Sequence, residues 1–354
     1  MSLRALGWDD EWQRVFEQEP AAGTIPARVL AEHRGMYRIG TGSQNELPAE
    51  LAGKLRHEAI RRSELPAVGD FVRVRTDSQG GPAIVASVLP RRTAFIRKAA
   101  GKSHDDQVVG ANLNTVLIVS ALDGDFNLRR LERYLTLAWE SGAAPVIVLN
   151  KADLSHEAAE RMAETEAIAY AVPIHITSAL EHDGLEVLDQ YLQPGQTLGV
   201  IGSSGVGKST LINRLLGQDV QVTKDVRSGD SRGRHTTTHR QLFERPGGGI
   251  VLDTPGMREL QMWSADEGLG AAFPEIAALA EQCRFRDCQH TSEPGCAVRA
   301  AIERGELDPE RLTSHAKLLR ELQYANARTD RNAMLERKRE ERIANKAMKP
   351  FKQR

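Results

Sequence analysis

The sequence has few of the features that mark secreted or membrane proteins. Its 354 residues include only three cysteines, an odd number that argues against a disulfide framework and favours a reduced, cytoplasmic setting. The longest apolar runs, near 115–122 and 143–149, are too short to span a bilayer and are typical of buried strands. Residues 1–20 are polar and acidic, which excludes a signal peptide or an anchor.

A net charge is also nearly absent. The 47 basic and 48 acidic side chains give a formal charge of −1, so affinity for nucleic acid has to come from local patches. One patch is residues 331–354, with nine basic and three acidic side chains. It can contact phosphates or form a solvated helix, because the glutamates are interspersed. A second basic stretch, at 91–102, is either a linker or the start of the next domain.

The length of the chain predicts two or three domains. After a polar lead at 1–23, which has no recognisable motif, short β-like segments separated by turn residues fill 24–97 and indicate a small all-β barrel. Strands and helices alternate through 98–262, which indicates a multidomain α/β protein with a mostly parallel central sheet and flanking helices. Residues 263–354 are mainly helical and end in the basic tail.

The residue pattern also predicts the bounds of individual strands and helices. In the barrel we expect strands at Ile25–Leu30, Met36–Gly40, Phe71–Val74 and Ala83–Val88, while 54–57 could be strand or helix. In the central region we expect strands at Thr115–Ser120, Ala144–Leu149, Ile174–Thr177, Thr197–Ile201 and Gly249–Asp253. The expected helices are 128–142, Glu157–Ala169, Leu185–Leu192, Thr210–Leu216, Glu267–Ala280, Val298–Arg304 and a long run from Glu310.

A glycine-rich loop predicts a phosphate-binding site. The pattern Gly202-x4-Gly207-Lys208-Ser209 follows an apolar strand and precedes a helix, as this motif requires. Glycines let backbone N–H groups turn toward phosphate oxygens, and the helix N-terminus adds its dipole. We expect Lys208 to act on the β and γ phosphates in catalysis and Ser209 to bind Mg²⁺. The loop residues expected to contact nucleotide are Gly202, Ser203, Ser204, Gly205, Val206, Gly207, Lys208, Ser209 and Thr210.

A second motif, Asn150-Lys151-Ala152-Asp153, closes the strand Ala144–Leu149 and predicts recognition of guanine. The Asp153 carboxylate can accept from N–H groups on the Watson–Crick edge of guanine, whereas adenine presents an acceptor there. We expect Asn150 to tie this loop to the phosphate loop, and the Lys151 stem to pack on the purine face. A backbone N–H in Ser178-Ala179, after the next strand, can donate to guanine O6.

The order of the two motifs is unusual. Ordinary GTPases carry the phosphate loop first, whereas here the base-reading motif at 150–153 lies about fifty residues upstream of 202–209. The sequence therefore predicts a circularly permuted GTP-binding domain.

The segments after the phosphate loop predict the hydrolytic machinery. Asp253 is expected to hold Mg²⁺ through water, and the Gly256 N–H to contact the γ phosphate. A loop at 228–240, rich in Gly, Thr, Arg and His, contains three adjacent threonines that spacing does not rank. We take Thr237 as the one that completes the Mg²⁺ shell.

Met257 stands where many GTPases carry the glutamine that orients the attacking water. A thioether cannot polarise water, so another group has to do so, or hydrolysis is slow until a partner helps. His235 is the nearest candidate catalytic residue. It can equally serve as an RNA contact or as an ordinary loop histidine.

All three cysteines gather with one histidine in Cys283-x4-Cys288-x-His290-x5-Cys296. Four soft ligands at these spacings suit a tetrahedral Zn²⁺ ion. A Cys3His shell has no open coordination position, so the predicted role is structural.

The permuted order of the GTP motifs followed by the Cys3His pattern resembles the circularly permuted family known as ribosome small subunit-dependent GTPase A. The resemblance runs from about Thr24 into the C-terminal tail. It implies an N-terminal OB-fold, a permuted GTPase core and a C-terminal zinc domain. It also implies one zinc ion on Cys283, Cys288, His290 and Cys296, and a hydrophobic residue at the position of Met257.

The resemblance further implies a late-acting factor in assembly of the small ribosomal subunit, with GTP hydrolysis stimulated by that subunit. We therefore expect a cytoplasmic, monomeric GTPase that uses Mg²⁺ and binds ribosomal RNA through its barrel and basic tail. Alternatives are a P-loop kinase or ATPase, a GTPase acting on another RNA or in translation, and a GTP-dependent RNA-binding module with little turnover.

Overall fold

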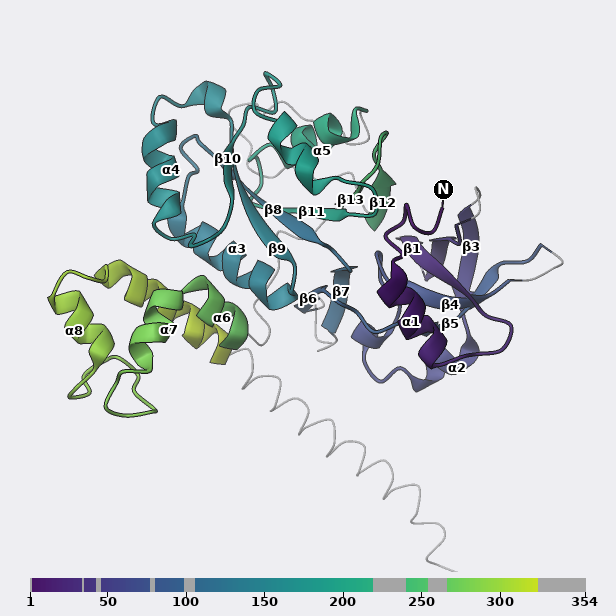
Figure 1. Cartoon of the computed structure of the whole chain (residues 1–354), viewed down its shortest axis with the longest axis horizontal. Coiled ribbons are helices and arrows are strands. Elements are labelled where there is room, and N and C mark those ends of the chain that lie inside the picture. Colours follow the sequence, from purple (N-terminus) through teal and green to yellow (C-terminus); the bar gives the residue numbers. More distant parts are fainter. Residues whose placement is uncertain are drawn as a thin grey trace, which may run out of the picture.

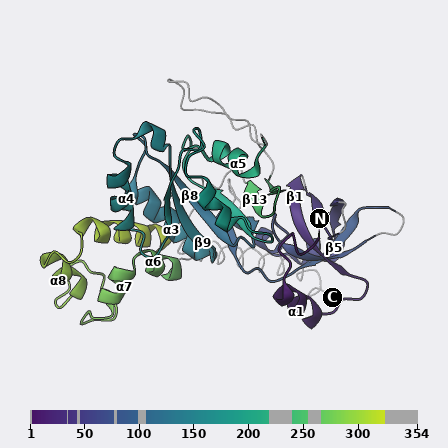
Figure 2. The same cartoon turned by 45° about the horizontal axis from the view of Figure 1, so that its top comes forward.

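The computed structural model describes residues 2–33, 35–42, 46–76, 80–98, 106–218, 240–253 and 266–323. Figure 1 shows three parts in a row: a β-rich part at the N-terminal end, an α/β part in the middle, and a group of helices at the far side. The tilted view in Figure 2 keeps the same order. The middle part carries the nucleotide motifs.

Five strands close the N-terminal part into a barrel. Strand β1 (Ile25–His33) pairs antiparallel with both β2 and β4, and β3 pairs in parallel with β5, so the order runs β1-β2-β3-β5-β4 and back to β1. The other strands are β2 (Met36–Gly40), β3 (Glu46–Leu51), β4 (Phe71–Arg75) and β5 (Ala83–Val88). The expected all-β barrel is confirmed, and its strand number is that of the OB-fold.

Two barrel elements differ from the pattern expected. The strand β3 was not anticipated, because it contains Pro48 and buries fully only Ala49. The ambiguous segment 54–57 lies in a helix, α2 (Gly53–Glu58), which is followed by the 3₁₀ turn η1 (Arg62–Glu64).

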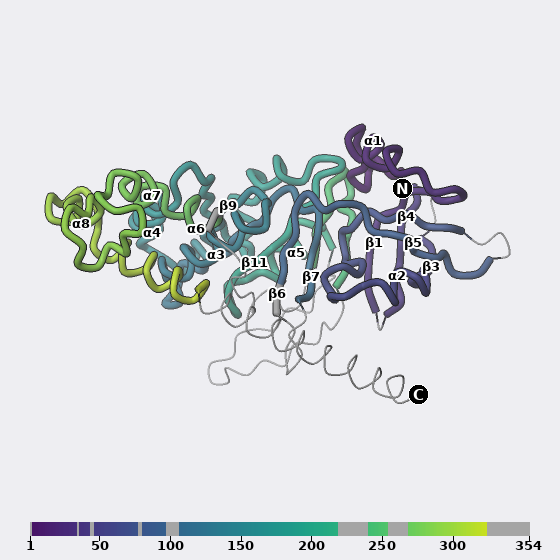
Figure 3. Tube along the Cα trace, turned by 90° about the horizontal axis from the view of Figure 1, so that it is seen from below, coloured from purple at the N-terminus to yellow at the C-terminus, as the bar shows by residue number. Residues whose placement is uncertain are grey.

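The polar lead packs on the barrel. Helix α1 (Asp10–Gln18) begins at Asp9, whose carboxylate accepts from the Trp12 N–H at 2.8 Å. The Trp12 ring lies 4.7 Å from the ring of Phe71, measured between centroids, and Trp8 packs on the same ring. Trp12 in the helix and Trp8 just before it therefore hold the nine-residue α1 on β4. Figure 3 shows α1 against the barrel strands.

The basic stretch after the barrel is the start of the next body rather than a linker. Strand β6 (Ala94–Lys98) pairs with β7 (Asp106–Ala111) as an antiparallel hairpin. Phe95 and Val109 are buried in the same apolar cluster as the central strands, which ties the hairpin to the α/β part.

The central sheet has the order β10-β9-β8-β11-β13-β12 and continues through β1 into the barrel. The five strands β10, β9, β8, β11 and β13 are parallel, as expected, while β12 runs antiparallel between β13 and β1. The bounds are β8 (Thr115–Ala121), β9 (Ala144–Asn150), β10 (Ile174–Ile176), β11 (Thr197–Ile201), β12 (Arg240–Glu244) and β13 (Ile250–Asp253). Strand β12 was not anticipated.

The helices confirm most of the pattern. Helix α3 (Leu128–Ser141) begins at Asn127, whose side chain accepts from the Arg130 N–H, and ends at Gly142 with φ 82°. The expected helix at 185–192 is a 3₁₀ helix, η3 (Glu186–Tyr191), and the expected 267–280 helix is two helices because Pro274 starts a new one. The remaining helices are η2 (Ala152–Leu154), α4 (Ala158–Glu166), α5 (Lys208–Leu216), α6 (Asp266–Ala272), α7 (Pro274–Ala280), α8 (Ala297–Glu303) and 309–323.

One buried cation joins the barrel to the central part. Arg28 of β1 is 1% exposed, and burial lowers the pKa of its guanidinium to about 9, so it stays charged at neutral pH. Its Nη1 donates to Leu6 O at 2.6 Å and to Thr197 Oγ1 at 2.8 Å. Its Nε donates to Gly69 O and its Nη2 to Asn112 O. Arg28 thereby fixes the lead, the barrel and the start of β11 relative to one another.

Within the described ranges, no helix is both long and apolar enough to cross a bilayer.

The close contact between α6 and α3 gives a test of packing. A Cβ at Gly268 would meet Thr136 O at 2.8 Å and Glu140 N at 2.9 Å, whereas a Cβ at Gly270 on the same helix meets nothing within 4 Å. Gly268→Ala should therefore destabilise the protein by about 1–3 kcal/mol through overpacking. Gly270→Ala should be neutral, or stabilising by up to about 1 kcal/mol. Thermal unfolding of both variants checks this; equal midpoints would contradict the α3–α6 packing.

Candidate functional site

The phosphate loop has the backbone that its glycines permit. Between β11 and α5, Gly202, Gly205 and Gly207 have φ values of 146°, 84° and 95°. A Cβ at Gly202 would lie 2.3 Å from Val119 O, and one at Gly207 would lie 2.3 Å from Asn150 Nδ2. Two of the three glycines are thus required by close contacts with neighbouring strands as well as by backbone geometry.

Lys208 lies across this loop. Its Nζ donates to Gly202 O at 2.8 Å and also to Ser203 O, so the ammonium group is held at the loop. Lys208 is the first residue of α5, and Ser209 follows it in the first helical turn. The loop therefore brings a cation, a hydroxyl and a helix N-terminus together, which suits a polyphosphate.

The Asn150 side chain joins three loops. Asn150 is 2% exposed at the end of β9, and its Nδ2 donates to Val206 O in the phosphate loop at 2.8 Å. Its Oδ1 accepts from the Ala179 N–H at 3.0 Å and from Thr177 Oγ1 at 3.2 Å. The expected tie between the base-reading motif and the phosphate loop is present, and it also includes the loop after β10.

Asp153 is held beside this junction. Ser178 Oγ donates to Asp153 Oδ1 at 2.5 Å, and the Ala152 N–H donates to Thr177 O at 3.1 Å. These contacts orient one carboxylate oxygen toward the protein and fix the loop in which it lies. The Asp153 side chain thus comes from a constrained loop end at the carboxyl edge of the parallel sheet, where ligands of such sheets bind.

Lys151 is fixed by a residue that the sequence motifs did not single out. Lys151 has φ 65°, and its Nζ forms an ion pair with Asp123 Oδ2 at 2.7 Å. Burial raises the pKa of Asp123, but the hydrogen bond from Lys151, the Asp125 N–H and the Lys151 charge together outweigh it and lower that pKa. Asp123 could have been suspected from its place just after β8, at the same sheet edge as Asn150 and Gly202.

The hydrolytic residues are only partly described. Asp253 ends β13, is 9% exposed, and lies on the strand next to β11, so it reaches the same edge as the phosphate loop. The predicted residues His235, Thr237, Gly256 and Met257 lie outside the described residues, as does the basic tail at 331–354.

The Cys3His residues come together in the C-terminal helices. The ligand atoms of Cys283, Cys288, His290 and Cys296 all lie within 4.8 Å of one another. The His290 Nδ1 lies 3.7 Å from Cys283 Sγ and 3.5 Å from Cys296 Sγ. Ligands of a tetrahedral zinc ion are separated by about 3.5 to 3.8 Å, so this arrangement fits one metal ion.

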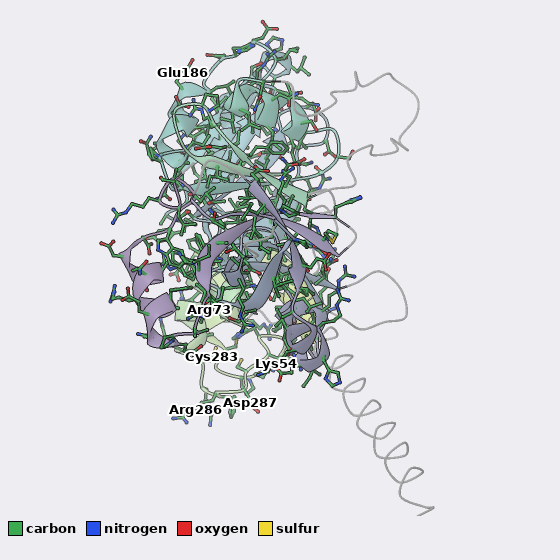
Figure 4. All side chains as sticks on the ribbon, turned by 90° about the vertical axis from the view of Figure 1, so that its right-hand side faces the viewer. Lys54, Arg73, Glu186, Cys283, Arg286 and Asp287 are labelled. Atoms are coloured by element: carbon green, nitrogen blue, oxygen red, sulfur yellow. The ribbon has the colours of Figure 1, made fainter. Side chains whose placement is uncertain are left out.

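The local chain explains how these ligands converge. Cys296 is the N-cap of α8, and Gly295 before it has φ 76°. The Glu293 carboxylate accepts from the Gln289, Thr291 and Ser292 N–H groups, and these bonds lower the pKa of Glu293 to about 2. Burial lowers the pKa of His290 and favours the neutral imidazole that can bind metal. Figure 4 shows Cys283 near Arg286 and Asp287 and far from Glu186 of η3.

Comparisons with known proteins agree with this arrangement. The family model described as RsgA GTPase matches residues 88–263. A small ribosomal subunit biogenesis GTPase RsgA from Opitutus terrae is 49% identical over 339 residues, covering 93% of this chain and 92% of that protein. A second, from Lactiplantibacillus plantarum, is 49% identical over 317 residues, covering 89% of each.

Two solved structures share the fold. The crystal structure of YjeQ from Thermotoga maritima has a TM-score of 0.64 at 29% identity, covering 84% of this chain and 98% of that one. The structure of YloQ, described as a circularly permuted GTPase, has a TM-score of 0.62 at 23% identity and covers 86% of this chain and 98% of that one. With nearly full-length relatives at this identity, the chain belongs to the RsgA family of GTPases.

Proposed function

We propose that this protein hydrolyses GTP during late maturation of the small ribosomal subunit, and that the subunit stimulates the hydrolysis. The observation that carries the proposal is the Asn150 side chain, which joins the base-reading loop, the Thr177–Ala179 loop and the phosphate loop. The names of the relatives, which describe biogenesis of the small ribosomal subunit, support the biological step.

In this proposal, one group of residues at the sheet edge binds the guanine base and another group binds the phosphates. Asp153 accepts from the guanine Watson–Crick edge, Lys151 packs along the purine, and a backbone N–H of Ser178-Ala179 donates to O6. The phosphate-loop N–H groups and Lys208 hold the phosphates and stabilise the charge that develops on the leaving oxygen.

Mg²⁺, when bound with GTP, would neutralise negative charge on the phosphates. Ser209 and Asp253 would hold it, Asp253 through water. Thr237 as a further ligand, Gly256 as a γ-phosphate contact and His235 as the group that orients water remain predictions from the sequence.

The Cys3His residues are proposed to hold one structural Zn²⁺ ion. A fourfold shell of Cys283, Cys288, His290 and Cys296 leaves no open position, so the ion would stabilise the helices rather than take part in hydrolysis. We further propose a cytoplasmic monomer whose domains are 24–97, 98–262 and 263–354, after the lead at 1–23.

Ribosomal RNA is the proposed partner of the barrel. The α2–η1 segment exposes several cations and only two acidic side chains, one of which, Glu64, is occupied by the Ile60 and Arg61 N–H groups. Lys54 pairs with Glu58 at 3.8 Å and Arg62 with Glu32 at 4.0 Å, with both cations at exposed positions, so the segment keeps an excess of positive charge. An exposed surface with a positive excess suits phosphate contacts. The exposed cations are Lys54, Arg56, Arg61 and Arg62.

Base specificity gives the first test of this proposal. Asp153→Asn should weaken GTP binding by about 30- to 1000-fold, because it removes a charge-assisted pair of hydrogen bonds. It should also create affinity for xanthosine triphosphate, whose C2 carbonyl can accept from the new amide. Ser178→Ala is the matched control: it loosens Asp153 and should cost about tenfold without changing base preference. Isothermal calorimetry with GTP, ATP and xanthosine triphosphate measures the base preference of each variant. Unchanged GTP affinity in Asp153→Asn would contradict the assignment of Asp153 to the guanine base.

Turnover gives the second test. GTP hydrolysis should rise sharply when isolated small ribosomal subunits are added and should not rise with large subunits. Lys208→Ala should reduce the stimulated rate by about 100- to 1000-fold, because a positioned cation on the phosphates is lost. Multiple-turnover phosphate release measures both. No rise with any ribosomal particle contradicts the proposed step, whereas a protein that binds GTP without turnover would be a binding module.

Metal content gives the third test. Purified protein should hold about one zinc per chain, and His290→Ala should lose it while His156→Ala, an exposed histidine on the central part, retains it. Chelation should lower the unfolding midpoint of the C-terminal helices without abolishing GTP binding. A metal-free protein with the same midpoint would contradict the zinc assignment.

A further inference from the structure

Helix α3 reaches the phosphate loop through its first turn. Arg130 Nη1 donates to Ser203 Oγ at 2.8 Å, and Ser203 Oγ donates to Asp125 Oδ2 at 3.0 Å. Arg130 and Asp125 also form a direct ion pair, which lowers the pKa of Asp125 and raises that of Arg130. Since Ser203 also accepts the Lys208 ammonium through its carbonyl, the loop is held from both sides at this residue.

The adjacent residues of the same helix hold the C-terminal helices. The Glu132 carboxylate is 1% exposed and accepts from Arg311 Nη1 at 2.7 Å and from Ser314 Oγ, both on helix 309–323. Arg311 also donates to Ala272 O at the end of α6. A buried carboxylate and a guanidinium that is 6% exposed therefore lock helix 309–323 to α3.

Two further ion pairs lie on the same face of α3. Arg129 pairs with Glu310 at 2.5 Å, and Arg133 pairs with Glu321 at 2.9 Å. Positions 129 and 133 lie one turn apart, with 132 about 60° from 129; position 130 is about 100° from 129 and about 160° from 132. Neighbouring residues of α3 thus contact two different parts of the protein, the phosphate loop and helix 309–323.

Helix α6 adds a third contact. The chain runs from Asp253 to α6 within 254–265, and α6 packs on α3 so closely that Gly268 leaves no space for a Cβ against Thr136 O. Figures 1 and 3 show α3 between the central sheet and the C-terminal helices. The helix therefore contacts both the C-terminal helices and, through Arg130, the phosphate loop.

We propose that Arg130 is a positioning residue through which α3 transmits the placement of the C-terminal helices to the phosphate loop. Packed helices move by sliding as units over on the order of 1–2 Å. A displacement of about 1 Å at a catalytic loop can change a rate by about 100-fold. The inference rests on the proposed function, because it assigns the stimulation by the small subunit to pressure on the C-terminal helices.

Coupling between two binding sites is reciprocal, so nucleotide should also alter the C-terminal helices. Hydrogen exchange followed by mass spectrometry tests this without any ribosomal particle. In the wild-type chain, peptides from 309–323 should exchange at different rates with GDP and with a non-hydrolysable GTP analogue. Arg130→Met should bind both nucleotides within about threefold of wild type and lose that difference. Arg304→Met, which removes an exposed pair with Glu306 in the same helical region, should keep it.

Turnover with small subunits provides the second readout. Arg130→Met and the double variant Arg129→Met/Arg133→Met should each lower stimulated kcat at least tenfold, with the KM for subunits unchanged. The triple variant should lose little more of the stimulated kcat than either parent variant, because both sets of substitutions interrupt the same coupling between the C-terminal helices and the phosphate loop. A raised KM with unchanged kcat would instead make these arginines RNA contacts and overturn the inference.

The inference is also overturned if exchange rates in 309–323 are the same with GDP and with the GTP analogue in the wild-type chain. It is equally overturned if the two rates still differ in Arg130→Met. If the wild-type chain shows no stimulation by subunits, the proposed function fails, while the exchange experiment still decides the coupling.

Discussion

The nucleotide site depends on one buried amide. Asn150 satisfies a carbonyl of the phosphate loop, an N–H of the loop after β10 and a threonine hydroxyl with a single side chain. Because the amide is 2% exposed, losing any of its partners would leave a buried polar group without water to replace it, at a cost of about 1–3 kcal/mol. The spacing between base-reading and phosphate-binding elements is thus set before nucleotide arrives, whichever motif comes first in the chain.

Charged side chains, rather than broad apolar faces alone, fix the three parts of the molecule relative to one another. Arg28 joins the barrel, the lead and β11, and Glu132 with Arg311 joins α3 to the C-terminal helices. Burying a charge costs several kcal/mol unless its partners are well placed. Any other arrangement of the three parts would leave these buried charges without partners, so the contacts favour one arrangement more than they add net stability. Such fixed contacts suit the coupling proposed above, in which the placement of the C-terminal helices affects the phosphate loop.

The sequence predicted the elements whose chemistry is local. The phosphate loop, the Asn150–Asp153 motif and the cysteine cluster each require particular residues at fixed spacing, and the strands behind them are continuous apolar runs. Elements that depend on distant partners were missed. Helix α1 is held by the contacts of Trp8 and Trp12 with Phe71, and β12 by its place between β13 and β1. Asp123 and Arg130 carry no motif, because their roles depend on where the loop after β8 lies against Lys151 and Ser203.

The order of the strands in the sheet also bears on how the chain is made. Strands β8, β9 and β10 form one side of the central sheet and leave the ribosome before β11 and the phosphate loop. Domains made first can fold first during synthesis. A nascent chain can therefore fold its barrel strands and pair β8, β9 and β10 before its phosphate loop has been made. Strand β12, which lies between β13 and β1, then joins the central sheet to the barrel, so the continuous sheet forms only after residues 240–253 have been made.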